Sequence, residues 1–228
     1  MTKYKAGIFD LDDTLYSYRV AHPMAMSVVC QLGCERTGLD NATFNTAFVK
    51  ARSLVKGRLG NVGASHNRLL YFQNLLEILG EQPVGLALEL FDCYWEVLLE
   101  KMTLFPGVMQ LFEEMKKRDM VIAICSDMTS VIQFRKLIKL GISEFIDVVV
   151  TSEESGLEKP DESSFRLCLE KLNVNADECF FVGDSYQKDV LGAMRLDMPV
   201  FWLGGDGTKQ SGVQSVSSFA NLHQILFE

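Results

Sequence analysis

No apolar run in this 228-residue chain approaches the 18 or so residues that a helix needs to cross a membrane. The stretch from Met1 to Lys5 is too short for a signal peptide before the first expected strand begins. Basic residues are in the minority and the formal net charge is -8, so nothing attracts the chain as a whole to nucleic acid polymers or anionic membranes. We therefore expect a cytoplasmic protein with no membrane segment, in which local cations and a metal ion attract any anionic ligand.

Paired cysteine motifs are also missing. The chain has six cysteines, but their spacing lacks the C-x-x-C arrangement that structural zinc sites favour. Several lie inside apolar runs, as Cys125 does after Ile122-Ala123-Ile124. We expect reduced core cysteines, as in cytosolic proteins, rather than a disulfide framework or a zinc site.

The composition, with 48% hydrophobic and 23% charged residues, is that of an ordinary globular protein. The chain is long enough for one large domain or for a domain with a sizeable insert. Between Val20 and about Lys101 the pattern is helical: Phe44, Phe48 and Ala51, for example, share one face at three- and four-residue steps. Glycines divide this block into what we interpret as four helices.

Strands and helices alternate from Leu104 onward. Apolar runs predict buried strands at 6–9, 121–125, 148–150, 179–182 and 200–203. Amphipathic stretches predict helices at 108–117, 130–140, 162–172 and 189–196. This alternation is typical of the α/β class, here a Rossmann-like, doubly wound parallel sheet covered on both faces. We expect a catalytic core over 1–17 and 102–228 and an inserted, all-helical cap domain over 18–101 that acts as a lid.

Five residues, Asp10-Leu11-Asp12-Asp13-Thr14, follow the first predicted strand. Strand alternation would place Asp10 and Asp12 on one face. At the carboxyl end of a parallel strand, that face looks into the crevice where open α/β sheets bind ligands. Paired carboxylates can hold a hard cation there, and one of them can act as a covalent nucleophile. Taken alone, the cluster is equally well explained as an acidic surface turn.

Three further polar groups follow predicted strands: Ser126-Asp127, Lys159-Pro160, and Gly183-Asp184 with Asp189. Each has an ordinary interpretation by itself, as a helix cap, a solvated lysine or a tight turn. However, the residue before a proline is held extended, so the Lys159 side chain is aimed in one direction. Because the carboxyl ends of neighbouring parallel strands converge, we expect all these groups to form one site.

In this combination and order, the motifs resemble those of the haloacid dehalogenase superfamily, specifically its phosphatases with a helical, C1-type cap inserted after the first strand. The resemblance implies a Mg²⁺-dependent phosphomonoester hydrolase that works through an aspartyl phosphate. It implies Asp10 as the nucleophile, Asp12 as the general acid and base, Ser126 as a donor to a phosphate oxygen, Lys159 as the cation that bridges nucleophile and phosphate, and Thr14 as the residue that orients the first loop. The dehalogenases of the superfamily lack an acid two residues after the nucleophile, so Asp12 argues against dehalogenation.

The same resemblance implies a magnesium site. Its ligands would be the Asp10 carboxylate, the Asp12 backbone carbonyl and Asp184, with Asp189 in support. A phosphomonoester dianion repels an approaching carboxylate, so the reaction needs this positive charge before attack can occur. The leaving alkoxide needs a proton, which Asp12 can supply if its pKa is raised.

The substrate class implied is a small phosphorylated metabolite: a nucleoside monophosphate, a sugar phosphate or phosphoglycolate. A phosphomutase that uses the same aspartyl phosphate is the alternative enzyme. A non-catalytic binding or regulatory protein on this fold is a third interpretation, but such proteins typically lose the nucleophile, the acid or a metal ligand, and none is missing here.

Specificity must come from the helical block, because the core motifs recognise only the phosphoryl group. Polar and cationic residues gather between Arg52 and Arg68, beside glycines that would let the chain bend as a loop. Within this stretch we expect His66 and Arg68 to contact the leaving group. The alternative is a solvated connection between helices that never meets substrate.

Two other features are expected to carry no function. The stretch Gly204–Lys209 lacks the spacing of a phosphate-binding P-loop and reads as an ordinary surface loop. His22 and His223 have no partner pattern, and we expect them to be structural or solvated.

Overall fold

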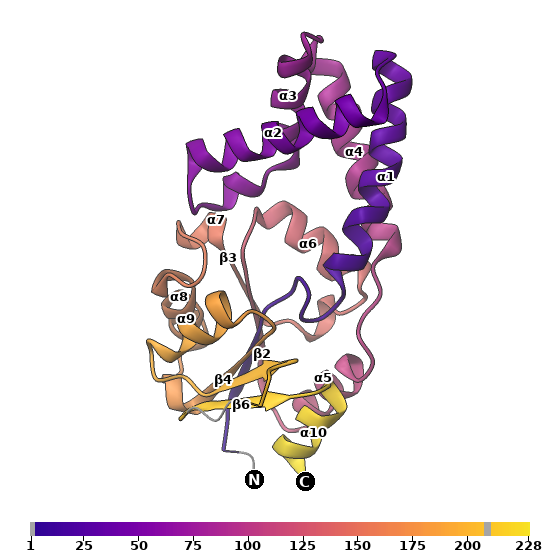
Figure 1. The fold of residues 1–228 in the computed structure, drawn as a ribbon. Coiled ribbons are helices and arrows are strands. Elements are labelled where there is room, and N and C mark those ends of the chain that lie inside the picture. Colours follow the sequence, from indigo (N-terminus) through magenta and orange to yellow (C-terminus); the bar gives the residue numbers. More distant parts are fainter. Residues whose placement is uncertain (1–2, 208–210) are drawn as a thin grey trace. The chain divides into compact units, whose positions relative to one another are not determined.

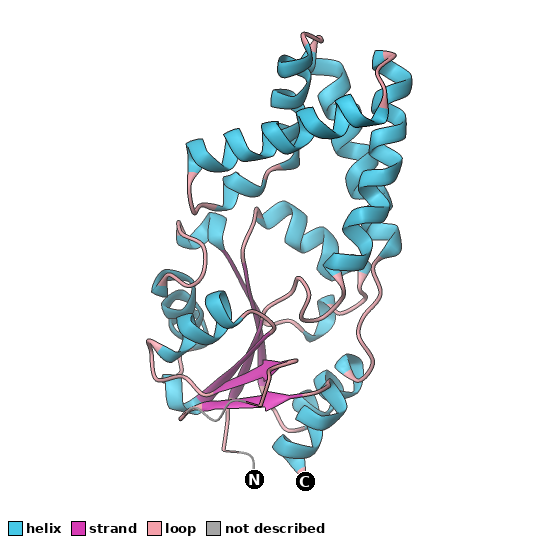
Figure 2. Cartoon of the chain, in the orientation of Figure 1, coloured by secondary structure: helices cyan, strands magenta, loops and turns pink. Residues whose placement is uncertain are grey.

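The computed structural model describes residues 3–207 and 211–228. The chain divides into two compact units, one formed by Met1–Ser17 and Thr103–Glu228 and the other by Tyr18–Met102 (Figures 1 and 2). Among the described helices, none combines the length and the apolar character needed to cross a bilayer. All six cysteines are free, and four of them are buried.

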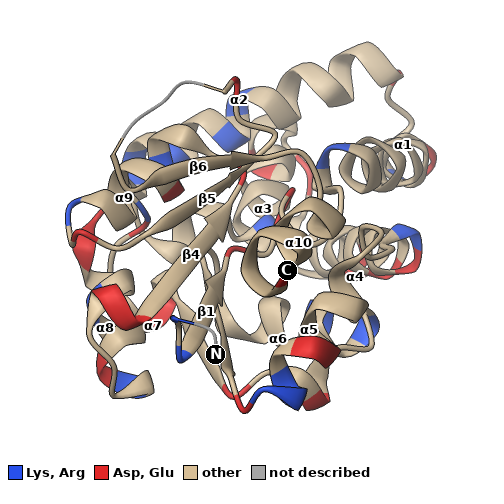
Figure 3. Cartoon of the chain, turned by 90° about the horizontal axis from the view of Figure 1, so that it is seen from below, with Lys and Arg blue, Asp and Glu red and all other residues tan. Residues whose placement is uncertain are grey.

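The first unit is built on a six-stranded, fully parallel sheet in the order β3-β2-β1-β4-β5-β6. The strands are β1 (Ala6–Phe9), β2 (Val121–Ser126), β3 (Val148–Thr151), β4 (Cys179–Gly183), β5 (Val200–Leu203) and β6 (Val213–Val216). Figure 3 shows β1, β4, β5 and β6 side by side. The strand order reverses at β1 and β4, and this switch point is where doubly wound sheets bind ligands. The predicted fold class is confirmed.

Helices cover both faces of this sheet. They are α5 (Val108–Lys117), α6 (Ser130–Lys139), α7 (Ser152–Ser155), α8 (Glu162–Leu172), α9 (Leu191–Met194) and α10 (Phe219–Phe227). On one face, Ile8 and Phe181 of the strands pack with Phe165 of α8. On the other, Phe9 meets Phe112 of α5, and α10 packs on α5. The strands are apolar on both faces because neither face meets water.

The second unit contains four helices and one 3₁₀ turn among its described residues. They are α1 (Tyr18–Thr37), α2 (Asn41–Leu59), η1 (Gly63–His66), α3 (Arg68–Leu79) and α4 (Pro83–Lys101). Phe44, Phe48 and Ala51 are buried, as their spacing predicts. The side chain of Asp40 accepts a hydrogen bond from the Thr43 amide and so caps the start of α2.

Several details differ from the sequence-based expectations. The edge strand β6 was not expected, because Val213–Val216 is polar at its two central positions. The predicted helix at 189–196 begins earlier, with a π-helical turn at Tyr186–Val190 that leads into α9. In the predicted loop at Gly204–Lys209, Thr208 and Lys209 lie outside the described residues.

Candidate active site

The first motif forms a turn rather than a continuation of its strand. β1 ends at Phe9, and Asp13 adopts a left-handed conformation with φ of 63°, which turns the chain back. The Asp10 amide still donates to the Val182 carbonyl at 2.9 Å, so Asp10 is fixed to the end of β4. Thr14 Oγ1 donates to Asp10 Oδ2 at 3.1 Å. The motif therefore continues the pairing of β1 with β4 as far as Asp10 and turns away at Asp13.

Lys159 links two buried carboxylates. Its Nζ lies 2.7 Å from Asp10 Oδ1 and 2.6 Å from Asp189 Oδ1, and it also donates to the Cys125 carbonyl at 3.1 Å. Asp127 Oδ1 accepts a hydrogen bond from the Lys159 backbone amide at 3.0 Å and so fixes the loop that carries it. Asp127 is thus not a helix cap: Thr129 occupies the position before α6.

The Asp10 carboxyl is strongly perturbed. Burial raises its pKa to about 8, because the charge of Lys159 only partly offsets the loss of hydration and the charges of Asp189 and Asp12 oppose ionisation. A cation beside Asp10 would favour the ionised form that a nucleophile requires.

Asp10, Asp184 and Asp189 form a cluster in which one carboxylate oxygen from each lies within 4.8 Å of the others. Thr14 Oγ1 accepts a hydrogen bond from the Asp184 amide at 3.2 Å, which joins the first and fourth motifs. Gly183 makes this packing possible, because a Cβ there would lie 2.4 Å from Asp189 Oδ2. Hard carboxylate oxygens at this spacing fit a magnesium ion.

Both carboxylate oxygens of Asp189 accept hydrogen bonds, as both oxygens of Asp10 do. Lys159 occupies Oδ1 of Asp189, and Oδ2 of Asp189 accepts from the Ser185 amide at 3.0 Å. Asp184 is partly exposed.

Asp12 lies in a separate polar pocket. Its Oδ1 accepts from Lys136 Nζ at 2.6 Å and from the Tyr16 hydroxyl, and its Oδ2 accepts from Gln133 Nε2 at 3.0 Å. Burial by itself would raise the pKa of Asp12, but the charge and hydrogen bond of Lys136 outweigh it and lower the pKa, helped by Tyr16 and Gln133. The general-acid role predicted from the sequence needs a raised pKa. In the substrate-free protein the pKa of Asp12 is instead lowered.

Ser126 at the end of β2 is buried and bound by the same glutamine. Gln133 Nε2 donates to Ser126 Oγ at 2.7 Å and to the Asp127 carbonyl at 2.8 Å. Because Ser126 Oγ accepts this hydrogen bond, its own hydrogen remains to be donated. The hydroxyl is thus prepared to bind an acceptor such as a phosphate oxygen.

Sequence reasoning missed Gln133, Lys136 and Tyr16. Gln133 and Lys136 lie three residues apart on α6, on the same buried face as Ile132 and Leu137. Polar residues on the apolar face of an amphipathic helix were the signal that could have identified the first two. Tyr16 had no comparable signal.

The two candidate residues of the helical unit have different surroundings. His66 ends η1 and is partly exposed. Arg68 begins α3, is buried, and donates to the His66 carbonyl and to the Tyr18 hydroxyl. Their assignment to substrate recognition stays a prediction.

Comparison with known proteins identifies the family to which this sequence belongs. The sequence pattern of haloacid dehalogenase-like hydrolases matches residues 4–197. A ribulose-1,5-bisphosphate 5-phosphatase of Halopiger xanaduensis is 38% identical over 82% of this chain and 80% of its own length. A glyceraldehyde 3-phosphate phosphatase of Methanocaldococcus jannaschii is 28% identical over 85% and 82%.

Two more distant proteins match nearly the whole length. A pyrimidine 5′-nucleotidase of Escherichia coli is 24% identical over 95% of this chain and 94% of its own. Among solved structures, the magnesium-bound hydrolase YfnB of Bacillus subtilis superposes with a TM-score of 0.73 at 21% identity, covering 98% of both chains. At this identity the superposition supports the fold alone.

Proposed function

The chain belongs to the haloacid dehalogenase-like hydrolases, and within that family we propose that it is a Mg²⁺-dependent phosphomonoester hydrolase that forms an aspartyl phosphate on Asp10. One observation carries the proposal: Lys159 bridges Asp10 and Asp189, and both carboxylates cluster with Asp184. A nucleophilic carboxylate, a fixed cation and a set of hard oxygen ligands are thereby gathered at one point. These are the groups that phosphoryl transfer needs.

The charge balance supports a divalent cation. With Asp10 ionised, as the reaction requires, the four carboxylates (Asp10, Asp12, Asp184 and Asp189) carry two more negative charges than the two ammonium groups (Lys136 and Lys159) balance. We propose that Asp10, Asp184 and the Asp12 backbone carbonyl hold Mg²⁺, with Asp189 in support. When bound, the ion would supply positive charge that reduces the repulsion between Asp10 and a phosphate dianion.

In the first half-reaction, an Asp10 carboxylate oxygen attacks phosphorus and the bond to the leaving oxygen breaks. Lys159 and Ser126 donate hydrogen bonds to the phosphoryl oxygens. Asp12 gives its proton to the departing alkoxide. A phosphate dianion beside Asp12 opposes the ionised carboxylate and so raises its pKa from the lowered value of the free protein.

In the second half-reaction, Asp12 is ionised and takes a proton from the water that attacks the aspartyl phosphate. The bond between the Asp10 oxygen and phosphorus breaks, which regenerates the carboxylate and releases phosphate. Lys136, Gln133 and Tyr16 hold the Asp12 carboxylate in one orientation through both steps. Their hydrogen bonds favour the ionised form that this half-reaction needs.

The substrate class we propose is a small phosphorylated metabolite. The relative that is 38% identical is named as a phosphatase of a sugar bisphosphate, one that is 28% identical as a phosphatase of a triose phosphate, and one that is 24% identical as a pyrimidine 5′-nucleotidase. Sugar phosphates are therefore the first class to examine, followed by nucleoside monophosphates and phosphoglycolate.

The test is a phosphate-release screen over a panel of phosphorylated metabolites, run with Mg²⁺ and with EDTA. We expect Mg²⁺-dependent release from at least one class of sugar phosphate or nucleotide. Isomer formation without free phosphate would instead identify a phosphomutase. An absence of both reactions across the panel would contradict the proposal.

A further inference from the structure

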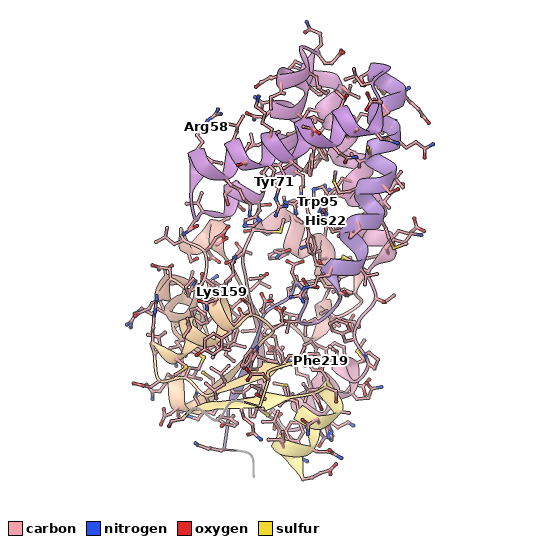
Figure 4. All side chains as sticks on the ribbon, viewed as in Figure 1. His22, Arg58, Tyr71, Trp95, Lys159 and Phe219 are labelled. Carbon is pink, nitrogen blue, oxygen red and sulfur yellow. The ribbon has the colours of Figure 1, made fainter. Side chains whose placement is uncertain are left out.

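Two cysteines lie side by side on α1, within the helical unit. Cys30 and Cys34 are four residues apart, so both lie on the same side of the helix. Cys30 is buried and Cys34 is half-buried, and both thiols donate to one acceptor, Asn41 Oδ1, at 3.3 and 3.2 Å. His22, on the same helix, is labelled in Figure 4. The shared acceptor holds the two sulfurs close to each other.

The connection between α1 and α2 places Asn41 beside this pair. α1 ends at Thr37, and the Asp40 side chain caps α2, which begins at Asn41. The two helices approach closely because Gly33 has no side chain: a Cβ there would lie 2.2 Å from the ring of Phe44. The position of the acceptor is therefore fixed by the packing of the two helices.

The pair opens onto a pocket of about 730 Å³, lined from α1 and α2. Its lining includes Met26, Cys30 and Cys34. Met26 precedes Cys30 by four residues, so three sulfur-containing side chains follow one side of α1. From α2, Asn45 Nδ2 donates to Cys30 Sγ at 3.3 Å, and a donor at this position also stabilises a thiolate. The pocket lets an ion from solvent reach the sulfurs.

This arrangement suits neither a disulfide nor zinc. Side chains four residues apart on a helix have Cβ atoms about 5–6 Å apart, whereas a disulfide needs about 3.5–4.5 Å. Structural zinc takes four ligands. Among residues 3–207 and 211–228, no third histidine, cysteine or carboxylate joins Cys30 and Cys34 in a group whose ligand atoms all lie within 4.8 Å of one another. An ion that needs only two thiolates fits, and soft sulfur ligands select Cu(I).

We propose that Cys30 and Cys34 form a binding site for one Cu(I) ion. Each sulfur gives its proton to solvent and forms one bond to the ion, with no change in oxidation state. Both thiols donate hydrogen bonds in the free protein, so both protons must leave. Burial and the neighbouring Cys34 raise the pKa of Cys30, which ensures that its proton is present beforehand. The site lies within the helical unit and does not depend on the proposed phosphatase function.

The first experiment measures the transfer of Cu(I) from bicinchoninate, whose coloured copper complex fades as the protein takes up the ion. The full chain is used without oxygen, Mg²⁺ or substrate. We expect wild type to bind one equivalent. Cys34→Ser should lower the affinity by at least about 100-fold, because one thiolate cannot form the two-coordinate complex. Cys30→Ser should show the same loss.

The number of protons released tests the ligand set directly. Cu(I) is added as its acetonitrile complex to protein in weak buffer with a pH indicator. Wild type should release about two protons for each ion bound, because both thiols become thiolates. Release of about one proton would show that only one cysteine binds the ion, and would overturn the paired site.

Cys93→Ser is the matched control. Cys93 is also half-buried, but it lies on α4 outside this pocket. Its replacement should leave both the copper affinity and the number of protons unchanged. Circular dichroism and the melting temperature check that each variant is folded.

Alkylation of wild type tests the site even if a variant does not fold. Iodoacetamide is added to the protein with and without one equivalent of Cu(I), and the digested peptides are weighed by mass spectrometry. Cu(I) should protect Cys34, while Cys93 should react equally in both samples. No copper uptake by wild type, equal affinity in wild type and Cys34→Ser, or equal protection of Cys93 would overturn the site.

Discussion

Lys136 is fully buried, and its Nζ lies 2.6 Å from Oδ1 of Asp12. Replacing it with methionine keeps the length of the side chain but leaves Asp12 without its counter-charge. We expect the free energy of unfolding to fall by about 3 kcal/mol near pH 7, because breaking a buried pair leaves an uncompensated charge. Urea denaturation measures this loss. Lys139→Met, an exposed position on the same helix, should change stability by less than about 0.5 kcal/mol.

The pH dependence of this pair has a definite sign. The pKa of Asp12 is lowered in the folded protein, so the pair stabilises the fold above the ordinary carboxyl range, and the stabilisation is lost as the pH falls through the folded pKa. The difference between wild type and Lys136→Met should therefore shrink in acid. A difference that stays constant from about pH 7 to about pH 3 would show that Lys136 does not stabilise ionised Asp12.

Asp10→Asn should abolish turnover without damaging the fold. The pKa of Asp10 is raised to about 8 by burial, so the folded protein binds a proton more tightly there than the unfolded chain does. Metal-free wild type should then lose stability as the pH rises from the ordinary carboxyl range towards 8. The variant has no such titration, so its melting temperature in EDTA should be equal or higher. Parallel melting curves at every pH would contradict the perturbed pKa.

The need for a metal ion can be tested by its effect on the melting temperature as well as by its effect on activity. EDTA should remove activity, Mg²⁺ should restore it, and Ca²⁺ should restore it poorly because its longer, more flexible coordination misplaces the nucleophile. Mg²⁺ should also raise the melting temperature of wild type. Asp184→Ala should lose that rise. Full activity after treatment with EDTA would show that the metal assignment is wrong.

Asp12→Asn should affect substrates according to their leaving groups. The alkoxide of an alkyl phosphate is a poor leaving group and needs a proton as it departs. The aryloxide of an aryl phosphate is a better leaving group and needs that proton less. We expect the rate of phosphoryl transfer from alkyl phosphates to fall by roughly 10²- to 10⁴-fold, with a much smaller loss for aryl phosphates. Rapid-quench kinetics on both substrate types measure this difference. Equal losses for alkyl and aryl phosphates would show that Asp12 is not the proton donor.

The fold was largely predictable from hydrophobic patterning. Strands buried on both faces read as continuous apolar runs, and five of the six were found in this way. The edge strand β6 was not predicted, because Gln214 and Ser215 interrupt its apolar pattern. The π-helical turn at Tyr186–Val190 escaped because its path follows the contacts of Asp189 within the site rather than a helical repeat.

The site was predictable where the sequence carries a motif after a strand. Asp10, Thr14, Lys159, Asp184 and Asp189 are brought together as the convergence of strand ends requires. The pocket around Asp12 was not predictable in the same way, because its partners come from α6, whose sequence was interpreted only as a covering helix. The charge state of Asp12 depends on those partners, so a lowered pKa could not be predicted from the motif alone.

The central claim is that Asp10 becomes covalently phosphorylated, and the Asp12→Asn variant offers the most direct test. Without the general base, the aspartyl phosphate formed from an aryl phosphate in Mg²⁺ should accumulate, because the step that hydrolyses it is slowed. The protein is quenched in acid and its mass is measured intact and after digestion. We predict the added mass of one phosphoryl group on the peptide that contains Asp10, absent when Asp10 is also replaced by Asn. Release of aryl alcohol without any adduct on that peptide, and undiminished by Asp10→Asn, would contradict the account.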